Sequence, residues 1–196
     1  VIVASTGVIG VPLQIEPIIT GIPTLLDKIS ATAEGSDTAA RAIMTTDTKK
    51  KEFAYEFNVG GKTAKIGGIC KGSGMIQPNM ATMLCFITTD IAIAPELLQT
   101  ALSEVIRDTF NMVSVDGDTS TNDMVTLLAS GKAGNAEVTS QDGDWEVFKA
   151  ALKLGCTDLC MAIAADGEGA TKLLECRVRN FGDAANARIL AKSVIN

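Results

Sequence analysis

The sequence predicts an α+β fold in which helices are layered on a largely antiparallel sheet. Apolar residues alternate along some short segments, as in half-buried strands, and recur at helical spacing along others. These segments follow one another without a regular strand–helix–strand repeat, which argues against a parallel α/β architecture. With 196 residues, 46% of them hydrophobic, the chain can form one compact domain with a core, or two small lobes.

The first half of the chain is expected to hold a short strand, two helices and a β-hairpin. The segments that carry these patterns are a strand at 1–5, helices at 25–29 and 38–44, and hairpin strands at 53–59 and 63–69. Ser36 and Asp37 offer an N-cap for the second helix. Gly60 and Gly61 supply the turn of the hairpin, because glycine adopts the backbone angles of tight turns.

The second half alternates between strands, helices and two polar loops. The expected loops are residues 71–81, with two glycines and a proline, and residues 116–123. The expected strands are 82–88, 124–129 and 173–178. Three helices are expected: one that begins at Pro95, one over 145–164, and one over 184–194.

Charge and composition exclude several classes of protein. The net charge is −6 and no basic cluster is present, which argues against nucleic-acid binding. No apolar run of the sequence is long enough to span a membrane, and we expect no signal peptide. Five cysteines, an odd number inside apolar runs, indicate buried free thiols in a reducing, cytoplasmic compartment. Both ends of the chain are expected to be cut from a longer protein.

The chain contains no histidine, which limits its chemistry. Ser-His-Asp and Cys-His catalysis and histidine metal sites are therefore impossible within these residues. Cys156 and Cys160 could share a helix face but make a poor zinc site alone. The acidic run at 116–123 fails the EF-hand pattern, because Leu127 stands where the closing glutamate belongs. We expect this run to be a hydrogen-bonded structural loop, and we assign no metal.

Thr82 stands where a glycine-punctuated loop meets an apolar strand. Cleavage of the Ala81–Thr82 bond would give Thr82 a free α-amine, whose pKa in model peptides is about 7.7–8.0. That amine could take the proton of the hydroxyl on the same residue, directly or through one water. The residues alone make an ordinary threonine at a strand start the simpler interpretation.

Six runs of the sequence, in order, resemble the ornithine acetyltransferase (ArgJ) family. They are ASTGVIG at 4–10, AIMTTDT at 42–48, KGSGMIQPNMATMLCFITTD at 71–90, SVDGDTSTND at 114–123, ADGEGATK at 165–172 and ARILAKSVIN at 187–196. The resemblance covers essentially the whole chain. It implies a layered α/β/β/α sandwich of the DmpA/ArgJ-like, N-terminal-nucleophile-like type.

The resemblance implies a self-cleaving glutamate N-acetyltransferase of arginine biosynthesis. Cleavage between Ala81 and Thr82 would make residues 1–81 the end of an α chain and residues 82–196 the start of a β chain. Thr82 would then carry acetyl from N2-acetylornithine to glutamate in a ping-pong reaction through an acetyl-threonine ester. Some family members also take acetyl from acetyl-CoA, and no other cofactor is implied.

The resemblance also assigns roles to individual residues. Thr6 and Gly7 match the family's oxyanion-hole pair, which would stabilise the tetrahedral intermediate. Thr45, Lys71 and Glu168, together with Thr82, match substrate-binding positions. Lysine can pair with the carboxylate of an amino acid substrate and glutamate with an ammonium group.

The resemblance further implies an α2β2 heterotetramer with small-molecule substrates and neither nucleic acid nor membrane as a partner. Two other hypotheses remain open. The chain could belong to a related self-processing N-terminal-nucleophile aminopeptidase or amidohydrolase. It could also be a non-catalytic domain or inactive fragment of the family.

Overall fold

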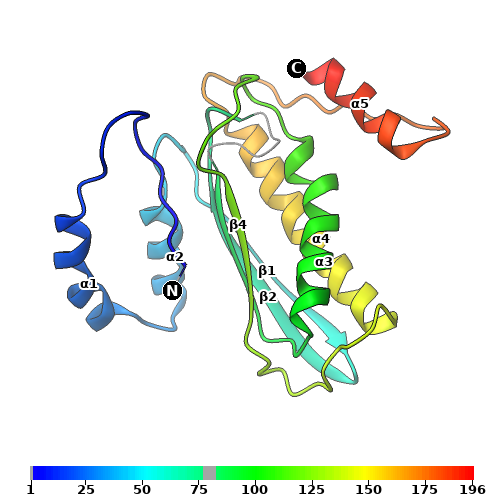
Figure 1. The fold of residues 1–196 in the computed structure, drawn as a ribbon, viewed down its shortest axis with the longest axis horizontal. Coiled ribbons are helices and arrows are strands. Elements are labelled where there is room, and N and C mark those ends of the chain that lie inside the picture. Colours follow the sequence, from blue (N-terminus) through cyan, green and yellow to red (C-terminus); the bar gives the residue numbers. More distant parts are fainter. Residues whose placement is uncertain (1, 77–82) are drawn as a thin grey trace.

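The structure is a computed structural model that describes residues 2–76 and 83–196. Four of the described segments form one sheet in the spatial order β1-β2-β3-β4 (Figure 1). The strands are β1 (Lys51–Val59), β2 (Lys62–Lys71), β3 (Leu84–Thr89) and β4 (Met124–Ala129). The pairs β1–β2 and β2–β3 are antiparallel, whereas β3 and β4 are parallel. The expected α+β class and the mainly antiparallel sheet are therefore confirmed.

Helices occupy both sides of the sheet and the C-terminal end of the chain. They are α1 (Glu16–Lys28), α2 (Ala33–Ala42), α3 (Pro95–Asp108), the 3-10 helix η1 (Phe110–Met112), α4 (Gly143–Ala165) and α5 (Ala184–Ile195). Helices α3 and α4 cover one face of the sheet, while α1 and α2 lie on the opposite side (Figure 1). Within the described residues, no helix is both long and apolar enough to cross a membrane.

The core lies between the sheet and helix α4. Alternate residues of β1 face this helix, so Phe53, Phe57 and Val59 are buried while the residues between them are mostly exposed. Helix α4 contributes Trp145 and Phe148, and the ring of Phe148 lies 6.1 Å from that of Phe57. Burial of these aromatic side chains fixes α4 across the hairpin.

Four of the five cysteines behave as buried small apolar residues, as expected, whereas Cys176 is only half-buried. All five are free, and Cys70, Cys85, Cys156 and Cys160 are buried in or beside the core. Burial raises the pKa of the Cys156 thiol to about 12, which leaves it protonated and unreactive.

The prediction of a strand is wrong for two segments. Residues 2–5 and 173–178 have no strand partner within the described residues and form irregular backbone, mostly exposed to solvent. An apolar run becomes a strand only where a neighbouring strand satisfies its backbone groups, and sequence pattern does not reveal that neighbour. The N-cap expected at Ser36 and Asp37 is also wrong. Helix α2 begins after Thr32, whose side chain accepts a hydrogen bond from the Gly35 amide at 3.0 Å.

Candidate active site

One end of the sheet brings together most of the residues singled out in the sequence. The register of the strands shows which ends meet: Lys51 pairs with Cys70, Lys71 with Leu84, and Leu84 with Met124. The loops that adjoin these strand ends therefore lie close together. Helix α4 ends at the same place, because Asp166 at its C-terminus contacts Lys51.

Lys71 and Thr45 are in direct contact at this end of the sheet. The Lys71 Nζ donates a hydrogen bond to the Thr45 hydroxyl at 2.8 Å, and Lys71 is only 3% exposed. Among the described residues, no carboxylate lies close enough to Lys71 to form an ion pair. A buried ammonium without a counter-ion is unfavourable, so this site is suited to an anionic group supplied by a ligand.

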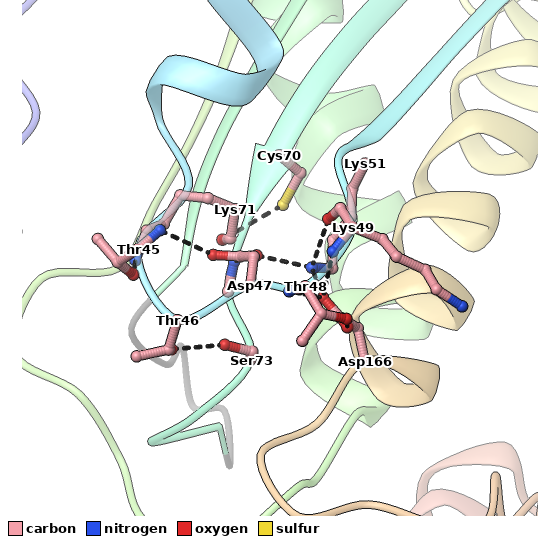
Figure 2. A network of polar contacts seen from close by, with 11 residues as sticks. Thr45, Thr46, Asp47, Thr48, Lys49, Lys51, Cys70, Lys71, Ser73 and Asp166 are labelled. Carbon is pink, nitrogen blue, oxygen red and sulfur yellow. Dashed lines mark hydrogen bonds and ion pairs between the residues drawn. The ribbon is translucent and has the colours of Figure 1, made fainter.

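Asp47 fixes the backbone on both sides of that contact (Figure 2). Its Oδ2 accepts a hydrogen bond from the Thr45 amide at 3.2 Å, and its Oδ1 accepts one from the Gly72 amide at 2.7 Å. Burial by itself would raise the pKa of Asp47, but the hydrogen bonds from Gly72, Lys51 and Thr45 outweigh it and lower that pKa. Asp47 is therefore ionised at neutral pH.

Lys51 connects Asp47 to the end of helix α4. Its Nζ lies 2.6 Å from Asp47 Oδ1 and 2.7 Å from Asp166 Oδ2, and its side chain is 1% exposed. Asp166 also accepts hydrogen bonds from the Thr48 amide at 3.0 Å and from the Thr48 hydroxyl. Burial would raise the pKa of Asp166, but Lys51 and Thr48 overcome that effect and lower it to about 2.

Glu168 reaches the same end of the sheet through a backbone contact with the loop after β2. Its amide donates a hydrogen bond to the Ser73 carbonyl at 2.7 Å, and its exposed carboxylate lies against Gly74. The Ser73 hydroxyl in turn lies 2.7 Å from the Thr46 hydroxyl. The structure thus places Glu168 near the segment that carries Thr45 and Lys71.

Two aspartates of the acidic loop bind the ends of the segment that contains the expected cleavage bond. Asp116 accepts hydrogen bonds from the Met75 and Ile76 amides, and Asp123 accepts one from the Met83 amide at 3.0 Å. The structural role expected for this loop is confirmed. Among the described residues, no group of three His, Cys, Asp or Glu side chains is arranged to hold a metal ion.

Asp123 keeps one oxygen unused in this arrangement. Its Oδ2 is buried and has no hydrogen-bond partner among the described residues. Burial raises the pKa of Asp123 to about 6, although the hydrogen bond from Met83 partly opposes this. A carboxyl group with a raised pKa therefore lies beside the amide of Met83.

The structure brings only part of the expected site together. Thr45, Lys71 and Glu168 lie at one end of the sheet, but Ala81 and Thr82 lie outside the described residues. Thr6 and Gly7 belong to the irregular segment before α1. In the part of the chain that the structure describes, no hydrogen bond joins Thr6 or Gly7 to Thr45, Lys71 or Glu168.

Sequence reasoning missed the charged residues that hold this end together. Lys51 carried a readable signal, because it shares the buried face of β1 with Phe53 and Phe57, where a lysine requires counter-ions. Asp47 and Asp166 lie inside the runs AIMTTDT and ADGEGATK, but nothing in the sequence shows that they meet.

The sequence is similar to curated proteins over its whole length. The protein "Arginine biosynthesis bifunctional protein ArgJ" of Lactococcus lactis is 51% identical over 195 residues, which cover 100% of this chain and 48% of that protein. The proteins of the same name from Bacillus subtilis and Geobacillus kaustophilus are 51% and 52% identical, and 47% of each is covered. The chain thus spans about half the length of these relatives.

A solved structure and a family model agree with this similarity. The crystal structure of arginine biosynthesis bifunctional protein ArgJ from Bacillus halodurans matches with a TM-score of 0.54 and 49% identity, covering 56% of this chain and 52% of that one. The ArgJ family model matches residues 1–196. The chain therefore belongs to the ArgJ family.

Proposed function

We propose that this chain is the central part of a glutamate N-acetyltransferase that moves acetyl from N2-acetylornithine to glutamate in arginine biosynthesis. Membership of the ArgJ family supports this proposal, as do the relatives' names as arginine biosynthesis proteins. The observation that carries it is the buried Lys71 ammonium, whose acceptor is the neutral hydroxyl of Thr45. An α-carboxylate of an amino acid substrate would supply the missing negative charge.

The reaction would proceed through an ester on Thr82. Cleavage of the Ala81–Thr82 bond would free the Thr82 amine, which takes the hydroxyl proton while Oγ attacks the acetyl carbonyl carbon. The C–N bond to ornithine then breaks and the leaving amine takes up that proton. The amine of glutamate attacks the ester in turn, releases N-acetylglutamate and restores the hydroxyl of Thr82.

Both steps pass through a tetrahedral oxyanion. The hydroxyl of Thr6 and the amide of Gly7 would donate hydrogen bonds to it, a contribution typically worth about 3 kcal/mol per donor. Lys71 and Thr45 would bind the α-carboxylate, and the exposed Glu168 carboxylate would bind the side-chain ammonium of ornithine.

The assembly follows from the same proposal. Residues 1–81 would end the α chain and residues 82–196 would begin the β chain of a cytoplasmic α2β2 enzyme, with acetyl-CoA as a second donor in bifunctional members. A second sheet would complete an α/β/β/α sandwich. This layering is supported by the face of the sheet opposite α3 and α4, where Leu128 is 51% exposed beside an open cavity of about 590 Å³.

Intact mass and N-terminal sequencing of the full-length protein test the proposal. Wild-type protein should give two fragments, one beginning at Thr82, and this fragment should gain one acetyl group when N2-acetylornithine is added without glutamate. Thr82→Ala should stay whole and inactive, because no other group replaces the hydroxyl. Thr82→Ser is the matched control and should retain cleavage with slower transfer.

Two results would count against the proposal. Cleavage of Thr82→Ala at the same bond would show that residue 82 is not the attacking group. Hydrolysis of amides with no preference for glutamate as acceptor would instead favour the self-processing aminopeptidase or amidohydrolase.

A further inference from the structure

We propose that Asp47, Lys51 and Asp166 form a buried charged clamp that positions the residues that bind substrate. This inference rests on the proposed function, since it concerns how Thr45, Lys71 and Glu168 are held in register. The three clamp residues come from the loop before β1, from β1 itself and from the end of α4. Their contacts with one another and with the neighbouring backbone are drawn in Figure 2.

Asp47 is the part of the clamp that sets the distance between Thr45 and Lys71. Each of its two carboxylate oxygens accepts a backbone N–H from a different segment, Thr45 on one side and Gly72 on the other. A backbone N–H can only donate, so both oxygens must be acceptors. The carboxylate therefore fixes the backbone of Thr45 relative to that of the residue that follows Lys71.

Asp166 joins the clamp to the segment that carries Glu168. Its Oδ2 accepts from Lys51 Nζ, from the Thr48 amide and from the Lys49 amide, the last at 3.3 Å. Its Oδ1 faces the hydroxyl of Thr48, which can act as donor or acceptor. Glu168 follows only two residues later, so the loop after α4 starts from a fixed point.

Stability alone does not account for a clamp of this kind. The three side chains are almost completely buried and together carry a net charge of about −1. Replacing such a group with packed apolar residues is often neutral or stabilising, because charges are costly to remove from water. Geometric control of the neighbouring binding residues is a function that apolar side chains could not supply.

Asparagine substitutions at Asp47 and Asp166 distinguish the effect of lost hydrogen-bond geometry from the effect of lost charge. Asp47→Asn and Asp166→Asn each remove one negative charge from the same buried group. In Asp47→Asn, the new side-chain amide has one oxygen for two backbone donors, so either Thr45 or Gly72 must lose its acceptor. In Asp166→Asn, the new amide could keep its oxygen toward Lys51 and turn its NH2 toward the Thr48 hydroxyl, which can accept.

The experiment is steady-state kinetics of acetyl transfer by the full-length protein. Asp47→Asn is expected to raise the KM for N2-acetylornithine about ten- to a hundred-fold and to change kcat less than about three-fold. Asp166→Asn should change KM less than about three-fold. Asp37→Asn, which removes an exposed partner of Arg41 and Lys50, is the control and should match wild type. Every variant should still self-cleave.

The kinetic pattern distinguishes positioning from general destabilisation. Partial unfolding would lower the apparent kcat through the active fraction and leave KM unchanged. If Asp47→Asn does not fold, the pair Asp166→Ala and Asp166→Asn replaces it, and only the alanine variant should raise KM.

If wild type is active and Asp47→Asn has an unchanged KM, the proposal that the clamp positions the binding residues is overturned. Equal effects of Asp47→Asn and Asp166→Asn on KM would also overturn it. With the replacement pair, equal KM values would do the same. Absence of any transfer by wild type would instead overturn the proposed function.

Discussion

Glu168 lies so close to Gly74 that no side chain fits between them. A Cβ built on Gly74 would stand 2.6 Å from the Cδ of Glu168 and within 2.8 Å of both carboxylate oxygens. The close approach joins the loop after β2 to the loop after α4, two segments that also share the hydrogen bond from the Glu168 amide to Ser73.

Gly74→Ala should therefore move the Glu168 carboxylate without destabilising the protein. The carboxylate is exposed and sits at the far end of a flexible side chain, so the free energy of unfolding should change by less than about 0.5 kcal/mol. The KM for N2-acetylornithine should rise in the same direction as in Glu168→Gln. Denaturant unfolding and steady-state kinetics measure the two effects.

Gly21→Ala is the matched control, because nothing lies within 4 Å of a Cβ at that position. It should leave KM at the wild-type value. A Gly74→Ala enzyme whose KM also equals that of wild type would show that the carboxylate of Glu168 does not bind substrate in this position.

Asp123 should make stability depend on pH in the range between about pH 4 and pH 6. Burial raises its pKa to about 6 in the folded protein, from 3.8 for an unperturbed group. A raised pKa means that the protonated form favours folding, so this contribution is complete below about pH 4 and is lost as pH rises through about 6. Asp123→Asn keeps a neutral acceptor for Met83 and should abolish that loss.

The comparison is best made by thermal unfolding at several pH values. At about pH 7, Asp123→Asn should be more stable than wild type by about 1 kcal/mol, a figure reduced because the side chain is only partly buried. Asp118→Asn removes an exposed carboxylate from the same loop and should follow the wild-type curve. Parallel curves for wild type and Asp123→Asn would contradict the expected titration.

The hairpin and the long helices could be predicted because their patterns are local. Phe53, Phe57 and Val59 alternate with exposed residues along β1, and the apolar stripe of α4 includes Phe148 and Leu159. Such periodicity reports which face of an element is buried. The failed strands at 1–5 and 173–178 are equally apolar, but the parts of them that the structure describes lack a partner strand, which local pattern cannot show.

The candidate site also contains residues that could be predicted from the sequence and residues that could not. Thr45, Lys71 and Glu168 could be named only because their runs of sequence resemble the ArgJ family, and the structure places them at one end of the sheet. The ion pair between Lys51 and Asp166 joins residues 115 positions apart, so only the folded chain reveals it. Long-range contacts of charged side chains leave no periodic trace in a sequence.

Substitution of Gly155 tests core packing, because an added methyl group has a favourable effect on the helix and a larger unfavourable steric effect. It lies in the middle of α4, and a Cβ there would stand 2.2 Å from Cε2 and 2.4 Å from Cζ of Phe53. Alanine is favoured over glycine inside a helix by about 1 kcal/mol. Overpacking a filled core costs about 1–3 kcal/mol, and the aromatic ring of Phe53 is held by the sheet beneath it, so the steric cost should exceed the helical gain.

Gly155→Ala is therefore expected to lower the midpoint of denaturant unfolding, with a net loss of up to about 2 kcal/mol. Gly143→Ala, at the start of the same helix, meets nothing within 4 Å and should be neutral or slightly stabilising. Both substitutions add a methyl group to α4, but only the one at Gly155 meets the ring of Phe53. Equal stabilities would mean that the ring yields to the added methyl, and Gly155→Ala should then change the free energy of unfolding by the same amount whether residue 53 is phenylalanine or leucine.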